Sequence, residues 1–156
     1  MNINEFITFL YNEGLITGNL SEETDEAFMN RLRIQKYVLI ARHLGIKEFY
    51  AYDYDIYIYG PYSSRLADEY YAYAKNSTTT VSVVNNIDKG FADKFLTIVR
   101  DKDNDWLEVA GTILHLKEKY SNKDTILNLA IDIKEHRFGK EKIEQIFKEL
   151  EGYGLL

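Results

Sequence analysis

The sequence predicts an α+β domain that is predominantly helical, with about six to seven helices and a short tyrosine-rich β-hairpin or wing. Three observations lead to this expectation. Apolar residues recur every three to four positions over most of the chain. Tyrosines alternate with other residues from Glu48 to Tyr59, as in an extended strand. The β-branched run from Thr78 to Val84 then indicates a second strand, which would pair with the first or form a wing.

The amino-terminal half should contain three helices. A short one is stopped by Gly14, and a long one with acidic first turns, or two abutting helices in its place, runs to Gly45. The third covers residues 64–75 and follows the tyrosine strand. The residues expected to cap these helices are Asn2 or Asn4, Ser21 and Ser63.

The carboxy-terminal half should contain four further helices. Their expected ranges are 88–100, 105–120, 122–137 and 140–152. Ser121 would cap the third, and Gly139 separates the last two. Because no linker divides the chain, we expect a single domain over 1–156, with sub-halves 1–76 and 77–156.

Composition excludes several classes of protein. The 156 residues contain no cysteine, so disulfides, thiolate metal sites and cysteine nucleophiles are excluded. A net charge of -6 argues against a general nucleic-acid coat, which needs clustered Lys and Arg. The start of the chain lacks the pattern of a secretory signal, and no apolar run is long enough to cross a bilayer. The expected location is cytoplasmic.

Three aspartates at 101, 103 and 105 resemble the start of a calcium loop. That loop needs glycine at its sixth position and glutamate at its twelfth. Trp106 and Thr112 stand there instead. We therefore expect an acidic turn between helices, with Asp105 as a helix cap, rather than a calcium site.

No other pattern predicts catalysis or a cofactor. Asp132 and Lys134 have a nuclease-like spacing, but a helical pattern surrounds them, so a solvated helix face is the preferred interpretation. The histidines His43, His115 and His136 are dispersed and do not form a helical zinc pair. The sequence therefore predicts a protein that is not an enzyme and binds no cofactor or metal.

A basic segment offers a candidate contact for DNA or another anion. Its candidate residues are Arg31, Arg33, Lys36 and Arg42. No acidic residue interrupts the segment from Arg31 to Lys47. A solvated helix face is the favoured interpretation because the whole chain is acidic, and a recognition helix is the functional alternative.

The surplus of tyrosines allows two interpretations that the sequence leaves open. The rings could form a partner surface, for which the candidates are Tyr50, Tyr52, Tyr54, Tyr70, Tyr71 and Tyr73. Alternatively, they could line the seam between the two halves, with hydroxyls bonded to Asp53, Asp55 or the backbone. Stacking on single-stranded nucleic acid is disfavoured because aspartates, not basic residues, lie between the rings.

Two blocks of sequence together resemble a known family. The first is Arg33-Ile-Gln-Lys-Tyr-Val-Leu39, and the second is Tyr57-Ile-Tyr-Gly-Pro-Tyr-Ser-Ser-Arg-Leu66. They resemble the YwgA-like family and, more distantly, the SocA-like (Panacea) antitoxin domain. The residues of this motif are Gln35, Lys36, Tyr59, Gly60, Pro61, Tyr62 and Ser63. Read physically, Gly60 should take the extended conformation favoured before proline, and Ser63 should begin the next helix.

The resemblance implies a small, mainly helical, non-enzymatic domain with a winged-helix-like carboxy-terminal half. Such a domain would bind a protein partner in the manner of an antitoxin or adaptor, and it carries no catalytic residue over to this chain. The alternative is a winged-helix-type transcriptional regulator that binds DNA through the basic helix or through residues 122–151. The sequence does not identify the partner or settle whether the protein forms homo-oligomers.

Overall fold

The computed structural model describes residues 1–76 and 87–156. Over these residues the fold is mostly helical, with seven α-helices, one 3₁₀ helix and one antiparallel hairpin, which confirms the predicted class. The elements are α1 (Ile3–Asn12), α2 (Asp25–His43), η1 (Lys47–Ala51), β1 (Asp55–Tyr57), β2 (Gly60–Tyr62), α3 (Ser64–Asn76), α4 (Lys89–Val99), α5 (Asn104–Lys117), α6 (Lys123–Phe138) and α7 (Lys140–Gly152). The strand predicted over 78–84 lies outside the described residues.

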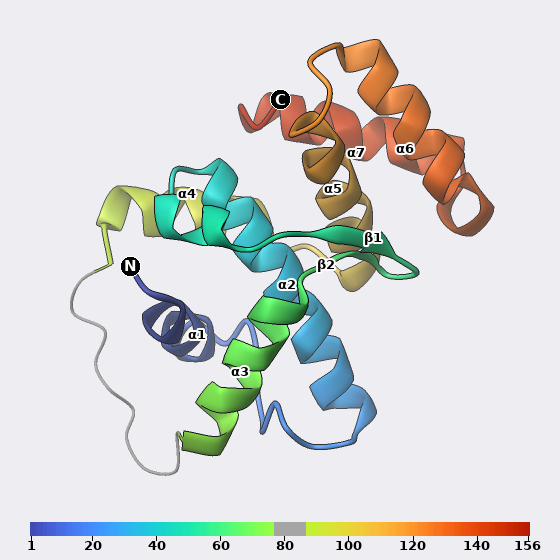
Figure 1. Ribbon diagram of the computed structural model, residues 1–156. Helices are drawn as coiled ribbons and strands as arrows, with labels where there is room; N and C mark the ends of the chain where they lie inside the picture. Colours follow the sequence, from blue (N-terminus) through green and yellow to red (C-terminus); the bar gives the residue numbers. More distant parts are fainter. Residues whose placement is uncertain (77–86) are drawn as a thin grey trace.

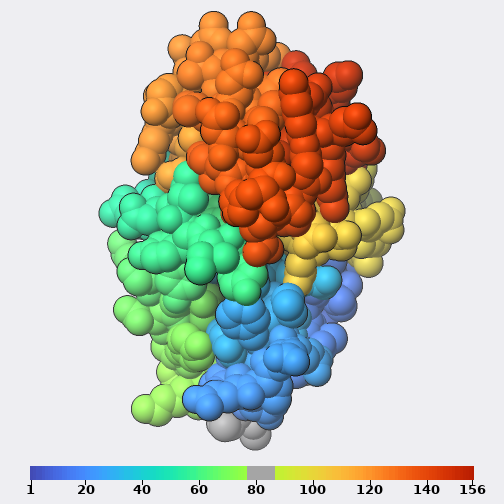
Figure 2. Space-filling view, turned by 90° about the vertical axis from the view of Figure 1, so that its right-hand side faces the viewer, coloured from blue at the N-terminus to red at the C-terminus, as the bar shows by residue number. Residues whose placement is uncertain are grey.

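Helices α2 and α5 pack against each other at the centre of the molecule (Figure 1). Helices α6 and α7 pack on α5, whereas α3 and α4 pack on α2 and α1 packs on α3. Figure 2 shows α6 and α7 at one end and the start of α2 at the other, with the hairpin segment between them. One cluster of buried apolar side chains runs through the described residues, from Phe6 in α1 to Leu155.

Side-chain caps begin most of the helices. Asn2 accepts from the Glu5 N–H, and Ser63 accepts from the Leu66 N–H, as predicted. Three other caps differ from the prediction, because Thr24, Asp103 and Asn122 fill the positions expected for Ser21, Asp105 and Ser121. The hydroxyl of Ser21 instead donates to Asn19 within the preceding turn. Neighbouring short polar side chains can all cap a helix, so spacing alone did not distinguish them.

The predicted tyrosine strand is wrong over its first half. Residues Lys47–Ala51 form a 3₁₀ helix, and strand geometry begins only at Asp55. The two strands pair in the register Asp55–Tyr62, Ile56–Pro61 and Tyr57–Gly60. The alternation of tyrosines therefore reflects contacts with other helices rather than a continuous sheet.

Gly60 has a different role from the one expected. Its φ is +96°, whereas no other residue type in the described chain has a positive φ. The turn residues Ile58 and Tyr59 therefore have negative φ, and Gly60 supplies the left-handed conformation that closes the hairpin. Gly60 belongs to strand β2, but its φ lies outside the negative range that is usual before proline, because the hairpin needs a left-handed position here.

A winged-helix arrangement of the carboxy-terminal half is not shown. Both strands precede α3, and residues 87–156 contain only the four helices α4 to α7 as regular elements. None of the described helices is both long and apolar enough to cross a membrane.

Candidate partner-binding surface and cationic cleft

Gln35 joins the two sequence blocks of the motif. From the buried face of α2, its Oε1 accepts from the Ser63 N–H at 2.8 Å, and its Nε2 donates to the Ser63 carbonyl at 3.0 Å. The Tyr54 hydroxyl donates to the Gln35 carbonyl at 2.9 Å. The corner between β2 and α3 is thereby attached to the centre of α2.

Lys36 threads its aliphatic stem between two glycines. A Cβ atom added at Gly60 would lie 3.2 Å from Lys36 Cε, and one added at Gly111 would lie 3.2 Å from Lys36 Cγ. Larger residues would compress this stem, so the glycines of the hairpin and of α5 make the space that Lys36 occupies. Gly111, within α5, thus packs closely against Lys36 and Pro61.

The amine of Lys36 is buried without a hydrogen-bond partner among the described residues. The residue is only 2% exposed. Burial lowers the pKa of Lys36 from 10.5 to about 7, and the nearby charge of Lys134 lowers it further while that of Glu108 opposes the change. Near neutral pH this group therefore lies close to the midpoint of its titration.

Glu108 on α5 forms ion pairs with two basic side chains of α6. Lys134 Nζ lies 2.9 Å from one carboxylate oxygen, and Arg137 lies 3.2 Å from the other. Lys134 also donates to the Ile58 carbonyl at 3.0 Å, and the Arg137 guanidinium lies 5.0 Å from the centre of the Tyr59 ring. These contacts attach the tip of the hairpin to α6.

The position of Lys134 corrects one interpretation of the sequence. The solvated helix face expected for Asp132 and Lys134 holds for the exposed Asp132 only. Lys134 is 2% exposed because α6 turns it toward Glu108 and the hairpin. Helical periodicity separated the two side chains as expected, but it did not reveal which of them faces the interior.

A cleft of about 80 Å³ opens beside these groups, between α2, α5, α6 and the hairpin. Its lining consists of Met29, Leu32, Arg33, Lys36, Tyr59, Asn104, Asp105, Leu107, Glu108 and Arg137. Arg33 Nε donates to Asn104 Oδ1 at 2.5 Å, which holds that guanidinium against the start of α5. The cleft therefore combines apolar walls with several cations.

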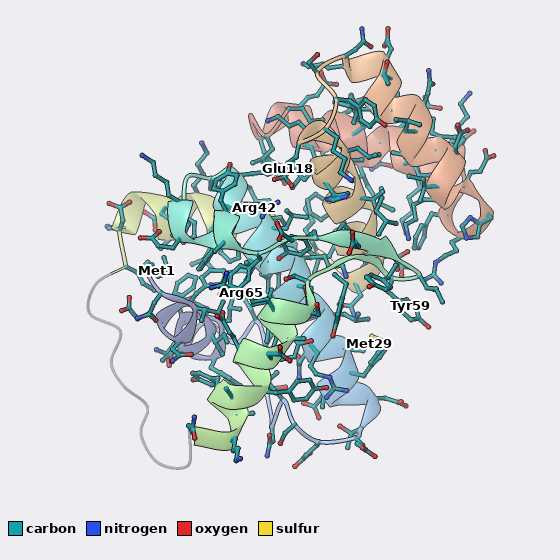
Figure 3. All side chains as sticks on the ribbon, viewed as in Figure 1. Met1, Met29, Arg42, Tyr59, Arg65 and Glu118 are labelled. Atoms are coloured by element: carbon teal, nitrogen blue, oxygen red, sulfur yellow. The ribbon has the colours of Figure 1, made fainter. Side chains whose placement is uncertain are left out.

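An exposed apolar surface adjoins the cleft. We define the tip surface as Phe28, Met29, Ile58 and Tyr59, whose exposed fractions are 36%, 42%, 72% and 41%. The rings of Phe28 and Tyr59 pack edge to face, with centres 5.7 Å apart. Figure 3 shows Met29 on α2 and Tyr59 on the hairpin on the same side of the molecule. Both residues also line the cleft, so the tip surface and the cleft are continuous.

Three of the six tyrosines predicted to form a partner surface belong to the core. Tyr52, Tyr54 and Tyr70 are 5%, 6% and 1% exposed and belong to the cluster of buried apolar side chains. Tyr73 is half-buried and hydrogen-bonds Thr8 at 2.9 Å. Only the remaining two, Tyr50 and Tyr71, are exposed.

Sequence reasoning missed the tip surface. Tyr59 was expected to belong to a corner motif, and Ile58, Phe28 and Met29 were not singled out. A signal was nevertheless present, because the two turn residues before Gly60 are large and apolar. Hairpin turns usually carry small or polar residues, so an apolar turn is a sign of a contact surface.

The four basic candidates separate into two groups. Arg42 is 6% exposed, and its guanidinium donates to the carbonyls of Phe49 and Tyr52 and binds the carboxylate of Glu118 (Figure 3). Arg31 donates to the carbonyls of Leu20 and Glu22 at 2.8 and 2.9 Å. The proposal of Arg42 as a DNA contact is therefore wrong, because the side chain is enclosed.

The other two basic candidates, Arg33 and Lys36, both line the cleft. The structure brings them together with Tyr59 of the motif, although they were predicted to serve different purposes. Only the tertiary structure brings these residues together, because the hairpin, which is in the second sequence block, packs against α2, which carries the first.

A second, more open cleft lies between α2 and the end of α5. Its volume is about 340 Å³, and its lining residues are His43, Tyr50, Lys117 and Glu118. Glu118 is 3.9 Å from His43 Nε2, yet burial lowers the pKa of His43 to about 4, with Lys117 and Arg42 adding to the effect. Burial likewise lowers the pKa of His115. Among the described residues, no group of three or more acidic, histidine or cysteine side chains could hold a metal ion.

Comparison with known proteins does not assign the chain to a family. The likeness of the two sequence blocks to YwgA-like and SocA-like proteins therefore stays a prediction. No family model, curated protein or solved structure matches the chain.

Proposed function

We propose that this protein is a non-enzymatic interaction domain that binds another protein through the tip surface. The observation that carries this proposal is the exposure of four large apolar side chains at one place, two of them in a tight turn. Contiguous exposed apolar side chains beside polar groups are typical of protein-binding sites. Aromatic residues at the centre of such a surface usually contribute most to affinity.

The surface is held rigidly before any partner binds. Lys134 holds the Ile58 carbonyl, Arg137 covers Tyr59, and Gln35 holds Ser63 at the base of the hairpin. A surface that is already ordered loses little conformational entropy on binding. These contacts support a binding role for Ile58 and Tyr59, because burial in the core does not explain large apolar side chains that are held in an ordered turn at the surface.

The resemblance to YwgA-like and SocA-like proteins supports the same class of function, with an antitoxin-like or adaptor-like role. DNA binding finds less support. Arg42 is buried, Arg31 donates to carbonyl oxygens of the chain, and Arg33 and Lys36 line a small cleft rather than an open face. A DNA-binding helix would instead present its cations to phosphates.

Affinity purification from the source cells tests the proposal. The tagged protein is compared with Ile58→Lys, which places a charge in the tip surface, and with Tyr120→Lys as a matched control. Ile58 is 72% exposed and its hydrogen bond to Lys134 is made by the backbone carbonyl, so the substitution should leave the fold intact. Tyr120 is 43% exposed and lies past the far end of α5 from the cleft.

The expected result is one polypeptide recovered at a fixed ratio with the unchanged protein and with Tyr120→Lys, and reduced at least about tenfold with Ile58→Lys. The recovered polypeptide is then purified and titrated against all three proteins, so that direct binding is measured. Recovery of the protein alone, or equal binding by Ile58→Lys, would contradict the proposal.

A further inference from the structure

We infer that the cleft beside the tip surface binds an acidic side chain of the partner, with Lys36 and Arg33 receiving its carboxylate. This inference rests on the proposed function and adds the chemistry of the partner to it. A partner segment would place apolar side chains on Ile58 and Tyr59 and an aspartate or glutamate in the cleft.

The first argument is the balance of charge in the cleft. Each of its two acids already faces a cation from another helix, since Glu108 binds Lys134 and Arg137, and Asp105 lies 3.8 Å from Lys142. Arg33 and Lys36 have no acidic ion-pair partner within 4.0 Å among the described residues. Arg33 donates to Asn104 and to the Leu15 carbonyl, which are neutral, so its charge and that of Lys36 can still attract an anion from outside.

The second argument is the state of Lys36. A buried amine without a hydrogen-bond partner is unfavourable in either protonation state. The stem is packed against Gly111 at Cγ and against Gly60 at Cε, but rotation about the Cδ–Cε bond still redirects Nζ. A carboxylate in the cleft would supply both the missing acceptor and the missing counter-charge.

The shape of the cleft favours an acidic side chain over other anions. Met29, Leu32 and Leu107 form apolar walls that suit a methylene stem. A volume of about 80 Å³ is small, which argues against a nucleotide or another large anion. Because Met29 and Tyr59 belong to both the tip surface and the lining of the cleft, a chain bound at the tip surface would lie close to the cations.

Binding should depend on pH, because the protonated form of Lys36 is the form that attracts a carboxylate. The charged and titratable groups that face it are Arg33 on α2, Asp105 and Glu108 on α5, Lys134 and Arg137 on α6, and Tyr59 on the hairpin. Since the pKa of free Lys36 is about 7, affinity should fall about tenfold per pH unit above that value.

Lysine-selective ¹³C NMR of the protein alone tests the inference without any partner. The probe is propionate, which matches a glutamate side chain, and the neutral control is propionamide. Lys36→Met identifies the signal of Lys36 and keeps an unbranched stem, whereas Lys75→Met removes an exposed lysine on α3. The titration midpoint of Lys36 in the unchanged protein is the main readout, so the test does not require the variant to fold.

Propionate is expected to raise the Lys36 midpoint by about one pH unit or more, and propionamide is expected to leave it unchanged. An unchanged midpoint, or an equal effect of propionamide, would overturn the inference. Binding of inorganic phosphate but not of propionate would overturn the choice of a carboxylate. Tighter binding of N-acetylglycine would assign the cleft to a chain end and overturn the choice of a side chain. None of these results depends on the purification experiment, so the two proposals fail separately.

Discussion

Gln35 and Ser63 form two reciprocal hydrogen bonds between the middle of α2 and the start of α3, at 3.0 and 2.8 Å. Both residues are buried, with exposed fractions of 0% and 1%. The Gln35 amide thus pairs with the Ser63 N–H and shares the Ser63 carbonyl with the Ala67 N–H of α3. This contact is the structural link between the two blocks of the motif.

Replacement of Gln35 by leucine should destabilise the fold by about 1–3 kcal/mol, because it leaves the buried Ser63 N–H unpaired, whereas the Ser63 carbonyl keeps its bond from the Ala67 N–H. Urea unfolding measures the change. The matched control is Gln145→Leu, since Gln145 is exposed on α7. We expect the control to change the free energy of unfolding by less than about 0.5 kcal/mol. Equal effects of the two substitutions would mean that the bonds to Ser63 contribute little.

Gly60→Ala should cost more than Gly139→Ala. Both glycines have positive φ, at +96° and +78°, but only Gly60 has atoms near the added methyl group. The Glu108 carbonyl oxygen would lie 3.3 Å from it, whereas nothing lies within 4 Å at Gly139. We expect about 1–2 kcal/mol at Gly139 from the conformation alone, and a further loss at Gly60. Thermal unfolding of both variants tests the difference, and a smaller loss at Gly60 would contradict the close packing with Lys36.

The stability of the protein should rise with pH above neutrality because of Lys36. Its pKa is about 7 in the folded state and 10.5 ordinarily, so the unfolded chain binds an extra proton between these values. The free energy of unfolding therefore increases with pH across this window, by up to about 1.4 kcal/mol per unit. Below about pH 7, Lys36 is protonated in both the folded and the unfolded state, so it no longer makes the free energy of unfolding depend on pH.

Urea unfolding at a series of pH values tests this dependence. Lys36→Met should flatten the rise between about pH 7 and about pH 10, whereas Lys75→Met should retain it. Above about pH 10 the free energy of unfolding should fall as the pH rises. Burial raises the pKa of Tyr11 from 10.0 to about 12, so the folded protein keeps a proton that the unfolded chain releases. A rise of the same size in Lys36→Met would show that other groups cause it.

Arg42→Met should be among the more damaging substitutions in the chain. It removes the bonds to the Phe49 and Tyr52 carbonyls and leaves Glu118 without its buried cation. We expect a loss of about 3–5 kcal/mol, typical of breaking a buried ion pair. Arg100→Met is the control, since Arg100 pairs with Glu13 at the surface and should lose at most about 1 kcal/mol. A mild effect of Arg42→Met in urea unfolding would contradict its role within the fold.

Much of the local structure could be predicted from the sequence. The helices follow from apolar residues spaced by three or four, and Gly14, Gly45 and Gly139 mark ends where the chain takes positive φ. Errors occurred where several residues offered the same local chemistry, as with Ser21 and Thr24. The prediction of a strand failed over the first half of the tyrosine segment. Alternating residues there do not indicate a sheet, because the rings at positions 52 and 54 are buried in the core.

The candidate site was less accessible to sequence reasoning. Lys36 and Lys134 look like ordinary surface lysines, since lysine is rarely buried. Their burial follows from Gly60 and Gly111, which leave room for one stem, and from Glu108, which offers a counter-charge to the other. These partners are distant in sequence, and nothing in local periodicity connects them.

The sequence by itself determined the predominantly helical class and the absence of cysteine chemistry, because these depend on composition and short-range spacing. Tertiary structure alone decided which charges are buried and which rings are exposed. The reason is physical: the exposure of a side chain depends on what packs over it. Here the hairpin folds across α2 toward α6, so that it buries Lys36 and leaves Ile58 in solvent.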